Sequence, residues 1–361
     1  MRLIKNYITI LVALVCFAGA KAQSDLPVVY FVKDITPENI VKLYDSLGVN
    51  FKGKTGVKVH FGEDGNRNFI NPELYRPLMK KVNGTFVETN VLYVGKRRFT
   101  DSHIEVAKKH GFTFAPIDII DADGEKDIDV TDLHLKHYKR VKTGTHFFDY
   151  DNYIILSHFK GHGSAGFGGA IKNLAMGFAS PGGKMAQHAS DVPVINDVAN
   201  CIGCGSCVQN CPGNAISLVD GKAVIDPEKC LGCAKCIAEC PLKLIAPDRK
   251  QLAENVFLER LVEYAYVYQR EKPMVYINVL ANISASCDCS ARAPLPFTQD
   301  IGIVASKDIV AIEKASHDLV AKGHNCEDAF LKESGVSGLG QVNYAEQLGM
   351  GKQKYRLVEI K

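Results

Sequence analysis

Short runs of apolar and β-branched residues alternate with amphipathic segments from residue 25 onward. The apolar runs predict buried strands at 28–32, 57–61, 85–88, 153–157, 275–280 and 301–305. The segments between them carry apolar residues at helical spacing, and the clearest predicted helices begin at Thr36-Pro37 and Asn71-Pro72 or cover 101–110, 252–268 and 306–320. Because strands alternate with helices, we predict an α/β fold with a mostly parallel sheet flanked by helices.

A cysteine-rich stretch interrupts this alternation and repeats one spacing twice. Eight of the twelve cysteines fall within 40 residues, as Cys201-x2-Cys204-x2-Cys207-x3-Cys211 and Cys230-x2-Cys233-x2-Cys236-x3-Cys240, each followed by proline. Bacterial ferredoxins with two [4Fe–4S] clusters use this spacing, and the fourth cysteine of each run ligates the other cluster. We therefore predict two [4Fe–4S] clusters, one on Cys201, Cys204, Cys207 and Cys240, the other on Cys230, Cys233, Cys236 and Cys211.

Zinc and disulfides are weaker interpretations of the same cysteines. Structural zinc takes four ligands from paired knuckles, so each run would leave a surplus thiol. A disulfide framework would be spread through a small secreted domain rather than crowded into one part of a long chain. The stretch 193–247 resembles a bacterial two-cluster ferredoxin, which implies a small α+β module.

The position of the cysteine stretch suggests an insertion. Predicted strands and helices lie on both sides of it, and neither side alone has enough strands to cover its helices. We predict a first part of an α/β domain at 25–190, a ferredoxin-type insert at 191–247 and the second part of the α/β domain at 248–361.

The first 22 residues have the pattern of a signal peptide. Arg2 and Lys5 precede an apolar run at 7–17, and Ala20-Lys21-Ala22 has the form of a cleavage site. We expect export to the periplasm and no membrane span in the mature chain. The alternatives are an uncleaved membrane anchor, a lipid anchor on Cys16, or a cytoplasmic protein, since clusters are normally built in the cytoplasm and the twin-arginine motif for exporting a folded protein is missing.

The charge of the mature chain argues against nucleic acid as a partner. The formal charge of the full sequence is +3, and removal of residues 1–22 takes away Arg2, Lys5 and Lys21 and no acidic residue, which leaves 0. No basic stretch remains, so the sequence offers no electrostatic footprint for nucleic acid.

A glycine-rich stretch at 158–187 is the first candidate for a chemical site. It contains His158, Lys160, His162 and Lys172, and it formally matches the dinucleotide fingerprint from Gly161 onward. A second βαβ half is missing before the cysteines, so nucleotide binding is disfavoured. Two interpretations stay open: an anion-binding loop that enters a helix near residue 170, or a tightly packed turn with solvated lysines.

Cys287-Asp288-Cys289 is the second candidate, because it follows a predicted buried strand at the end where α/β folds place ligands. With imidazoles from His60, His158 or His162, these residues could bind zinc or iron, form a redox-active thiol pair or supply a nucleophile. The alternative is two ordinary half-buried cysteines. The remaining histidines have polar neighbours and are expected at the surface: His103, His110, His134, His137, His317 and His324.

Six separated motifs resemble one protein family. They are Val57-Lys58-Val59-His60-Phe61-Gly62-Glu63, Thr89-Asn90-Val91-Leu92-Tyr93-Val94-Gly95, Ser157-His158-Phe159-Lys160-Gly161-His162, Ala170-Ile171-Lys172-Asn173-Leu174, Cys287-Asp288-Cys289 and Asp300-Ile301-Gly302-Ile303. In this order they resemble domain-of-unknown-function family 362, in its iron–sulfur-centre branch. The resemblance covers nearly the whole chain after the signal and implies no particular reaction.

Two classes of function remain. In the first, the protein is an oxidoreductase that passes electrons through two clusters between a redox partner protein and a small-molecule substrate. Its chemical site would then comprise Cys287, Cys289, His158, His162, Lys160 and Lys172, because reduction of an organic substrate requires protons as well as electrons. In the second, the protein is a ferredoxin-type carrier or adapter that docks a partner enzyme. We favour the first, because a carrier needs only the small ferredoxin.

Overall fold

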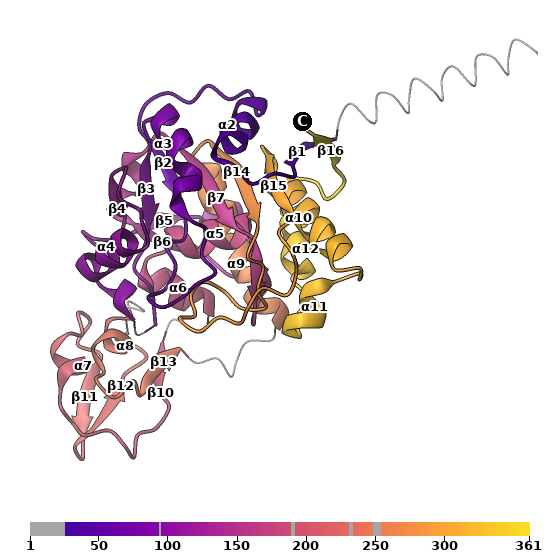
Figure 1. Cartoon of the computed structure of the whole chain (residues 1–361). Helices are drawn as coiled ribbons and strands as arrows, with labels where there is room; N and C mark the ends of the chain where they lie inside the picture. Colours follow the sequence, from indigo (N-terminus) through magenta and orange to yellow (C-terminus); the bar gives the residue numbers. More distant parts are fainter. Residues whose placement is uncertain (1–25, 94, 189–191, 231–233, 248–253) are drawn as a thin grey trace, which may run out of the picture.

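An eight-stranded sheet forms the centre of the molecule (Figure 1). The computed structural model describes residues 26–93, 95–188, 192–230, 234–247 and 254–361, so the predicted signal peptide lies outside the described residues. The strand order is β16 (Arg356–Glu359), β1 (Val28–Val32), β15 (Gly302–Ser306), β14 (Met274–Leu280), β7 (Asn152–His158), β2 (Thr55–Lys58), β3 (Thr85–Glu88) and β4 (Ile117–Ile119). All neighbouring pairs are parallel except the two that β15 makes. This arrangement confirms the predicted α/β class with a mostly parallel sheet.

The sheet joins segments from both sides of the cysteine stretch. β7 pairs in parallel with β14, and Ile154 lies opposite Val275 in the register. Both strands are apolar on both faces: Tyr153 and Ile155 of β7 face one core, while Ile154 and Leu156 face the other. A strand buried on both sides is typical of a parallel sheet covered by helices. The domain boundaries that the sequence suggested remain a prediction.

Helices cover both faces of the sheet. One core lies under α2 (Pro37–Ser46) and α3 (Arg76–Val82), and α4 (Thr100–Lys109) lies beside β4. The opposite core lies under α5 (Ala170–Phe178), α9 (Glu254–Glu271) and α10 (Ile309–Gly323). The short helices are α6 (Pro181–His188), α11 (Ala329–Ser334), α12 (Leu339–Gln347), η1 (Pro72–Tyr75), η2 (Lys96–Arg98), η3 (Thr131–Leu133) and η4 (Thr145–Asp149). Outside the sheet, the described part of the α/β body also has the strand pairs β5 (Glu125–Asp129) with β6 (Arg140–Gly144) and β8 (Lys160–His162) with β9 (Gly166–Gly168).

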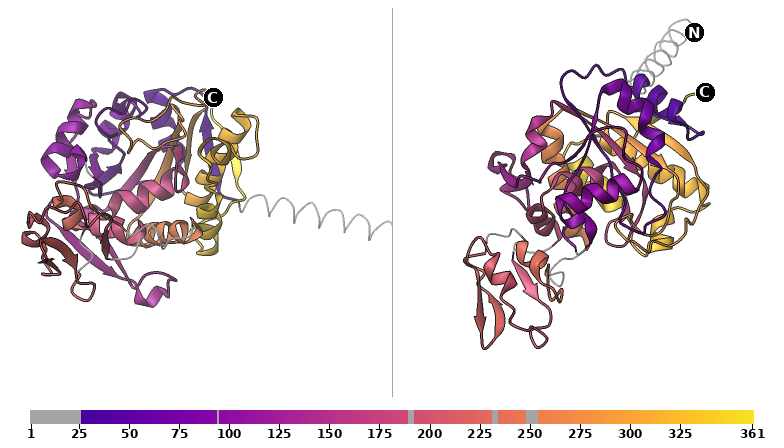
Figure 2. Two further views of the ribbon diagram at one scale, coloured as in Figure 1. Left: turned by 90° about the horizontal axis from the view of Figure 1, so that it is seen from below. Right: turned by 60° about the vertical axis from the view of Figure 1, so that its left-hand side comes forward.

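The described residues between 192 and 247, here called the cysteine lobe, project from one end of the α/β body (Figure 2). Their elements are β10 (Pro193–Ile195) paired with β13 (Ile245–Pro247), β11 (Ile216–Val219) paired with β12 (Lys222–Ile225), α7 (Ser206–Gln209) and α8 (Lys235–Glu239). Buried residues such as Ile216 and Ile237 form a small core of the lobe, and Met185 of α6 belongs to the same core. The lobe is therefore packed against the α/β body through α6.

The structure corrects several details of the sequence analysis. The strand expected at 57–61 ends at Lys58, and the helix expected from residue 306 begins at Ile309, because Asp308 is its N-cap and accepts a hydrogen bond from the Ala311 amide (2.8 Å). The helix expected at 252–268 is described from Glu254 and continues to Glu271. No helix in the described part of the chain is long and apolar enough to cross a membrane.

Two histidines expected at the surface are buried. His103 is 0% exposed, and its ring meets the ring of Phe61 edge-on at 5.6 Å. His317 is 2% exposed, and its Nε2 lies 3.3 Å from a carboxylate oxygen of Asp328. Both lie on the inner faces of their helices, and polar sequence neighbours do not reveal which face of a helix meets the core. The surface prediction was wrong for these two residues.

Candidate functional site

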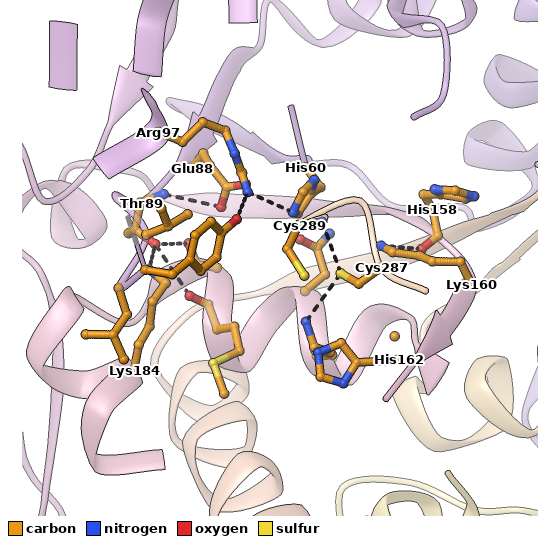
Figure 3. A pocket seen from close by; sticks show the side chains of 18 of the residues that line it. His60, Glu88, Thr89, Arg97, His158, Lys160, His162, Lys184, Cys287 and Cys289 are labelled. Carbon is orange, nitrogen blue, oxygen red and sulfur yellow. Dashed lines mark hydrogen bonds and ion pairs between the residues drawn. The ribbon is translucent and has the colours of Figure 1, made fainter. Parts of the chain in front are cut away.

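A polar cavity of about 270 Å³ lies where four neighbouring parallel strands end (Figure 3). β14, β7, β2 and β3 all present their carboxyl ends here, and the segments that follow them line the cavity. Ligands of α/β proteins bind at this edge of the sheet. The cavity is lined by all six side chains that the sequence suggested for a chemical site: His158, Lys160, His162, Lys172, Cys287 and Cys289. Their chemical role remains a prediction.

Asp288 fixes the turn that carries the two cysteines. Its carboxylate Oδ2 lies 2.8 Å from His158 Nδ1 and 3.4 Å from Lys160 Nζ. His158 Nε2 in turn lies 2.7 Å from the carbonyl oxygen of Ala281, so both ring nitrogens lie within hydrogen-bond distance of an oxygen and the ring is held in place. Burial would raise the pKa of Asp288, but the positive charges of His158 and Lys160 outweigh it and hold the pKa below its ordinary value. His158 and Lys160 therefore position the turn through Asp288.

Cys287 and Cys289 lie side by side at the wall of the cavity. The Cys289 amide lies 3.5 Å from Cys287 Sγ, and Lys172 Nζ lies 3.9 Å from the same sulfur. A hydrogen bond from the Cys289 thiol, and then the charges of Lys172 and Lys160, lower the pKa of Cys287 well below its ordinary value against the effect of burial. The same hydrogen bond and burial raise the pKa of Cys289. The positive charges thus favour the thiolate form at Cys287, and the hydrogen bond favours the thiol form at Cys289.

His162 brings an imidazole to the two sulfurs. One ring nitrogen of His162 and the sulfur atoms of Cys287 and Cys289 all lie within 4.8 Å of one another. These are donor types that bind zinc or iron. However, His162 Nδ1 accepts hydrogen bonds from the amides of Ser164 (3.2 Å) and Ala165 (3.1 Å). Because that nitrogen is an acceptor, a neutral ring carries its proton on Nε2.

A second polar network lines the other side of the cavity, and of its residues the sequence suggested only His60 for the site. Lys58 Nζ lies 2.8 Å from Glu88 Oε1, and Arg97 lies within 3.6 Å of the same carboxylate. Arg97 Nη2 also donates to the Tyr93 hydroxyl (2.5 Å) and lies 3.4 Å from His60 Nε2. Burial and the charge of Arg97 lower the pKa of His60 well below its ordinary value, so the ring is neutral. A sequence signal existed, because these residues lie at or just after the ends of β2 and β3.

Lys184 closes the cavity on the side of α6. Its Nζ donates to Thr89 Oγ1 and to the carbonyl oxygens of Asn90 and Ala179, both at 2.7 Å. Burial lowers its pKa to about 8, although the charges of Asp121 and Glu88 oppose this. Lys184 can therefore lose a proton near neutral pH, which is a property of side chains that transfer protons.

The glycine-rich stretch is a tightly packed turn in this structure. Gly166 has φ +71°, and a Cβ there would lie 2.1 Å from the Gly338 amide nitrogen. The first amide of α5, that of Ala170, donates to the Glu313 carboxylate at 2.6 Å. A carboxylate of the chain itself thus occupies the helix end that a bound anion would need. Of the two interpretations left open by the sequence, the geometry favours the packed turn, but its lysines are not solvated as expected, because Lys160 and Lys184 are buried.

Each predicted set of cluster ligands lines its own cavity in the cysteine lobe. Cys201, Cys204, Cys207 and Cys240 line one cavity. Cys211, Cys230 and Cys236 line another, and Cys233 lies outside the described residues. The fourth sulfur of each predicted set, which comes from the other run, accepts a hydrogen bond from a backbone amide. The Leu244 amide donates to Cys240 Sγ (3.4 Å), and the Ala215 amide donates to Cys211 Sγ (3.2 Å). The donor set and its grouping fit two [4Fe–4S] clusters with crossed fourth ligands.

Leu92 connects the two sites. It lines the polar cavity and also packs against the core of the cysteine lobe, together with Met185 of α6. Burial lowers the pKa of Arg98, and the negative charge of Glu239 opposes this shift. Glu239, at the end of α8, therefore lies near Arg98 of the α/β body. The polar cavity and the lobe are therefore neighbours in the fold.

Comparison with solved structures finds distant likenesses, among them the following two. The lactate racemase apoprotein from Thermoanaerobacterium thermosaccharolyticum aligns with 18% identity and a TM-score of 0.32, over 45% of this chain and 41% of that chain. A protein from Thermotoga maritima aligns with 13% identity and a TM-score of 0.35, over 86% of this chain and 58% of that chain. The chain therefore spans less than two thirds of either protein. At these TM-scores neither likeness carries an argument about function.

The family comparison, in contrast, gives a match that identifies the family. No curated protein matches the chain. The model of a family described as a domain of unknown function, DUF362, matches residues 55–318, which include the sheet strands β2 to β15, the polar cavity and the cysteine lobe. The chain belongs to the DUF362 family.

Proposed function

We propose that this chain is an iron–sulfur oxidoreductase. Two [4Fe–4S] clusters in the cysteine lobe would exchange electrons with a redox partner protein, and the polar cavity of the α/β body would bind a small-molecule substrate. The observation that carries this proposal is the position of Leu92, which lines the cavity and packs against the lobe. A carrier or adapter would have no need for a polar cavity beside its clusters.

The cysteine lobe supports the electron-transfer half of the proposal. Cys201, Cys204, Cys207 and Cys240 share one cavity, which is the grouping that a crossed ligand set requires. When bound, each cluster would supply one-electron transfer. The chain contributes thiolates, and the amides of Ala215 and Leu244 direct their hydrogens at ligand sulfurs, an interaction that tunes potential.

The polar cavity supports the substrate half. Two lysines of this cavity, Lys172 and Lys184, have no carboxylate within ion-pair distance among the described residues. The Lys184 ammonium instead donates to three oxygens of the chain, whereas Lys172 faces the Cys287 sulfur. Lys172 can therefore hold an acidic group of a substrate beside Cys287. His162 Nε2–H can donate a hydrogen bond to a substrate, and Lys184, with its pKa of about 8, can release a proton near neutral pH. The chain thus offers a proton donor for a substrate that takes up electrons.

The proposal can be tested on anaerobically reconstituted full-length protein. Iron and acid-labile sulfide analysis should give about eight of each per chain. The chemically reduced protein is then mixed with a panel of small disulfides, carbonyl compounds and unsaturated acids, while the visible absorbance of the clusters is followed. We expect one class of compound to reoxidise the clusters with a rate that saturates with concentration.

A pair of matched variants separates the enzyme from the carrier. Lys172→Met should abolish the saturable reoxidation, whereas Lys80→Met, at an exposed position of α3, should leave it unchanged. Reoxidation that rises linearly with concentration and is equal in both variants would favour the carrier. Stoichiometric zinc, or disulfides among the eight cysteines of the lobe, would overturn the cluster assignment itself.

A further inference from the structure

Cys287 and Cys289 lie on a tight turn that brings their side chains together. The Ser290 amide donates to the Cys287 carbonyl oxygen at 2.9 Å, so the chain reverses direction at Asp288. The two sulfurs lie within 4.8 Å of each other. Cys287 is only 2% exposed and faces the polar cavity together with Cys289. A disulfide requires close Cα atoms and converging Cβ vectors, and a turn with one intervening residue supplies both.

We propose that Cys287 and Cys289 form a redox-active pair that alternates between dithiol and disulfide, with Cys287 as the attacking thiolate and a small disulfide as substrate. This inference rests on the proposed function, because it identifies the chemical group through which the polar cavity would transfer electrons. It also explains why a cavity of small-molecule size has two adjacent sulfurs at its wall.

The positive charges around the sulfurs favour a free thiolate over a thiolate that is bound to a metal ion. Lys172 Nζ lies 3.9 Å from Cys287 Sγ, where its positive charge stabilises a thiolate but opposes a metal cation. Lys160 lies nearby, bound to Asp288 between the two cysteines. His162 would also have to give up the hydrogen bonds that Nδ1 accepts from Ser164 and Ala165, or its Nε2 proton, before it could bind a metal.

The reaction balances in atoms and electrons. The Cys287 thiolate attacks one sulfur of a substrate R–S–S–R, which forms a Cys287–S–S–R bond and releases RS⁻. The Cys289 thiol passes its proton to the first RS⁻, attacks Cys287 Sγ and releases the second RS⁻, which leaves a Cys287–Cys289 disulfide. Lys172, whose Nζ lies 3.9 Å from Cys287 Sγ, protonates the second RS⁻. Two electrons and one proton restore the Cys287 thiolate and the Cys289 thiol, a second proton restores Lys172, and two one-electron centres in the lobe would supply the electrons.

Asp288 has a positioning role in this scheme. Its ion pairs with His158 and Lys160 hold the turn, so the two sulfurs stay adjacent in both redox states. A disulfide closed across a single residue is constrained and therefore easily reduced, which suits a catalytic rather than a structural bond.

The test uses the intact, anaerobically purified protein. Samples are equilibrated in a series of reduced and oxidised glutathione mixtures, quenched with an alkylating reagent, digested and analysed by mass spectrometry. The peptide with both cysteines should carry two alkyl groups under reducing conditions and none, with two hydrogens lost, under oxidising conditions. Cys287→Ser and Cys289→Ser should each leave one thiol that never pairs with its neighbour, while Cys326→Ser should behave as wild type.

Two results would overturn the inference. One is a peptide that takes up two alkyl groups in every mixture, and the other is a metal ion bound per chain that is lost in Cys287→Ser. Iron and sulfide measured on the same samples keep the two proposals apart. Intact clusters without a disulfide would refute the thiol pair alone, whereas a reversible disulfide in a chain that binds no iron would refute the proposed electron-transfer function alone.

Discussion

The carboxylate of Glu313 accepts a hydrogen bond from the amide of Ala170, with an Oε1–N distance of 2.6 Å, and thereby caps the amino end of α5 from a different part of the chain. The same oxygen accepts a hydrogen bond from Asn278 of β14 (3.0 Å). One buried side chain thus ties α10, α5 and the central sheet together next to the polar cavity. Because the helix end is already satisfied, the glycine-rich turn before it serves packing rather than anion binding.

The first prediction concerns the pH dependence that Glu313 imposes on stability. Burial raises its pKa to about 7 from 4.5, so between these values the folded chain keeps a proton that the unfolded chain has released. Stability should therefore fall as the pH rises through this window, by roughly 3 kcal/mol at most. Glu313→Gln keeps the accepting oxygen and should lack this loss. Urea unfolding of both proteins at pH 5, 6, 7 and 8 measures the free energy of unfolding. The same pH dependence in both proteins would contradict the raised pKa of Glu313.

The second prediction concerns two glycines of one turn. Gly166→Ala should lower the free energy of unfolding by about 2 kcal/mol or more, because its φ is +71° and the added Cβ would meet the Gly338 backbone. Gly163→Ala is the matched control, since a Cβ there has open space, and it should change stability by less than about 0.5 kcal/mol. Denaturant unfolding decides the matter. Equal effects would show that the turn is not packed as described.

A third prediction concerns the buried ion pairs of Asp288. Asp288→Asn removes the negative charge beside His158 and Lys160, and leaves the buried Lys160 ammonium without its counter-charge. We expect the free energy of unfolding to drop by about 3–5 kcal/mol. Asp132→Asn, at an exposed site, should have little effect. Iron and sulfide contents should stay at the wild-type level in both variants, and a loss of iron from Asp288→Asn alone would show that the turn also supports the cysteine lobe.

A fourth prediction tests the crossing of the cluster ligands. Cys211→Ala should expose Cys230 and Cys236 to alkylation in the native protein, while Cys201, Cys204 and Cys207 stay protected, because Cys211 shares a cavity with the second run. Cys240→Ala should have the opposite effect. Each variant should keep about four of eight iron atoms. Alkylation of the run that contains the mutated cysteine would instead show that each run holds its own cluster.

The local sequence was enough to predict the class of fold and the position of the cavity. Strands such as 153–157 are apolar throughout, and only a sheet covered on both faces can bury such a run. The carboxyl ends of these strands then had to meet at one edge, so Lys160 and Cys287, far apart in the sequence, could be expected together. For the seven cysteines of the two runs that the structure describes, the spacing likewise predicted which of them share a cavity.

Tertiary structure decided the rest, because it depends on contacts that have no local signature. The antiparallel direction of β15 follows from the path by which the chain returns to the sheet, and the burial of His103 follows from which face of α4 meets the core. The network of Lys58, Glu88 and Arg97 balances its charges only once β2 and β3 lie side by side. Sequence pattern specifies which residues must be buried and which chemistry is at hand, whereas the partner of each buried charge is set by the packing of distant segments.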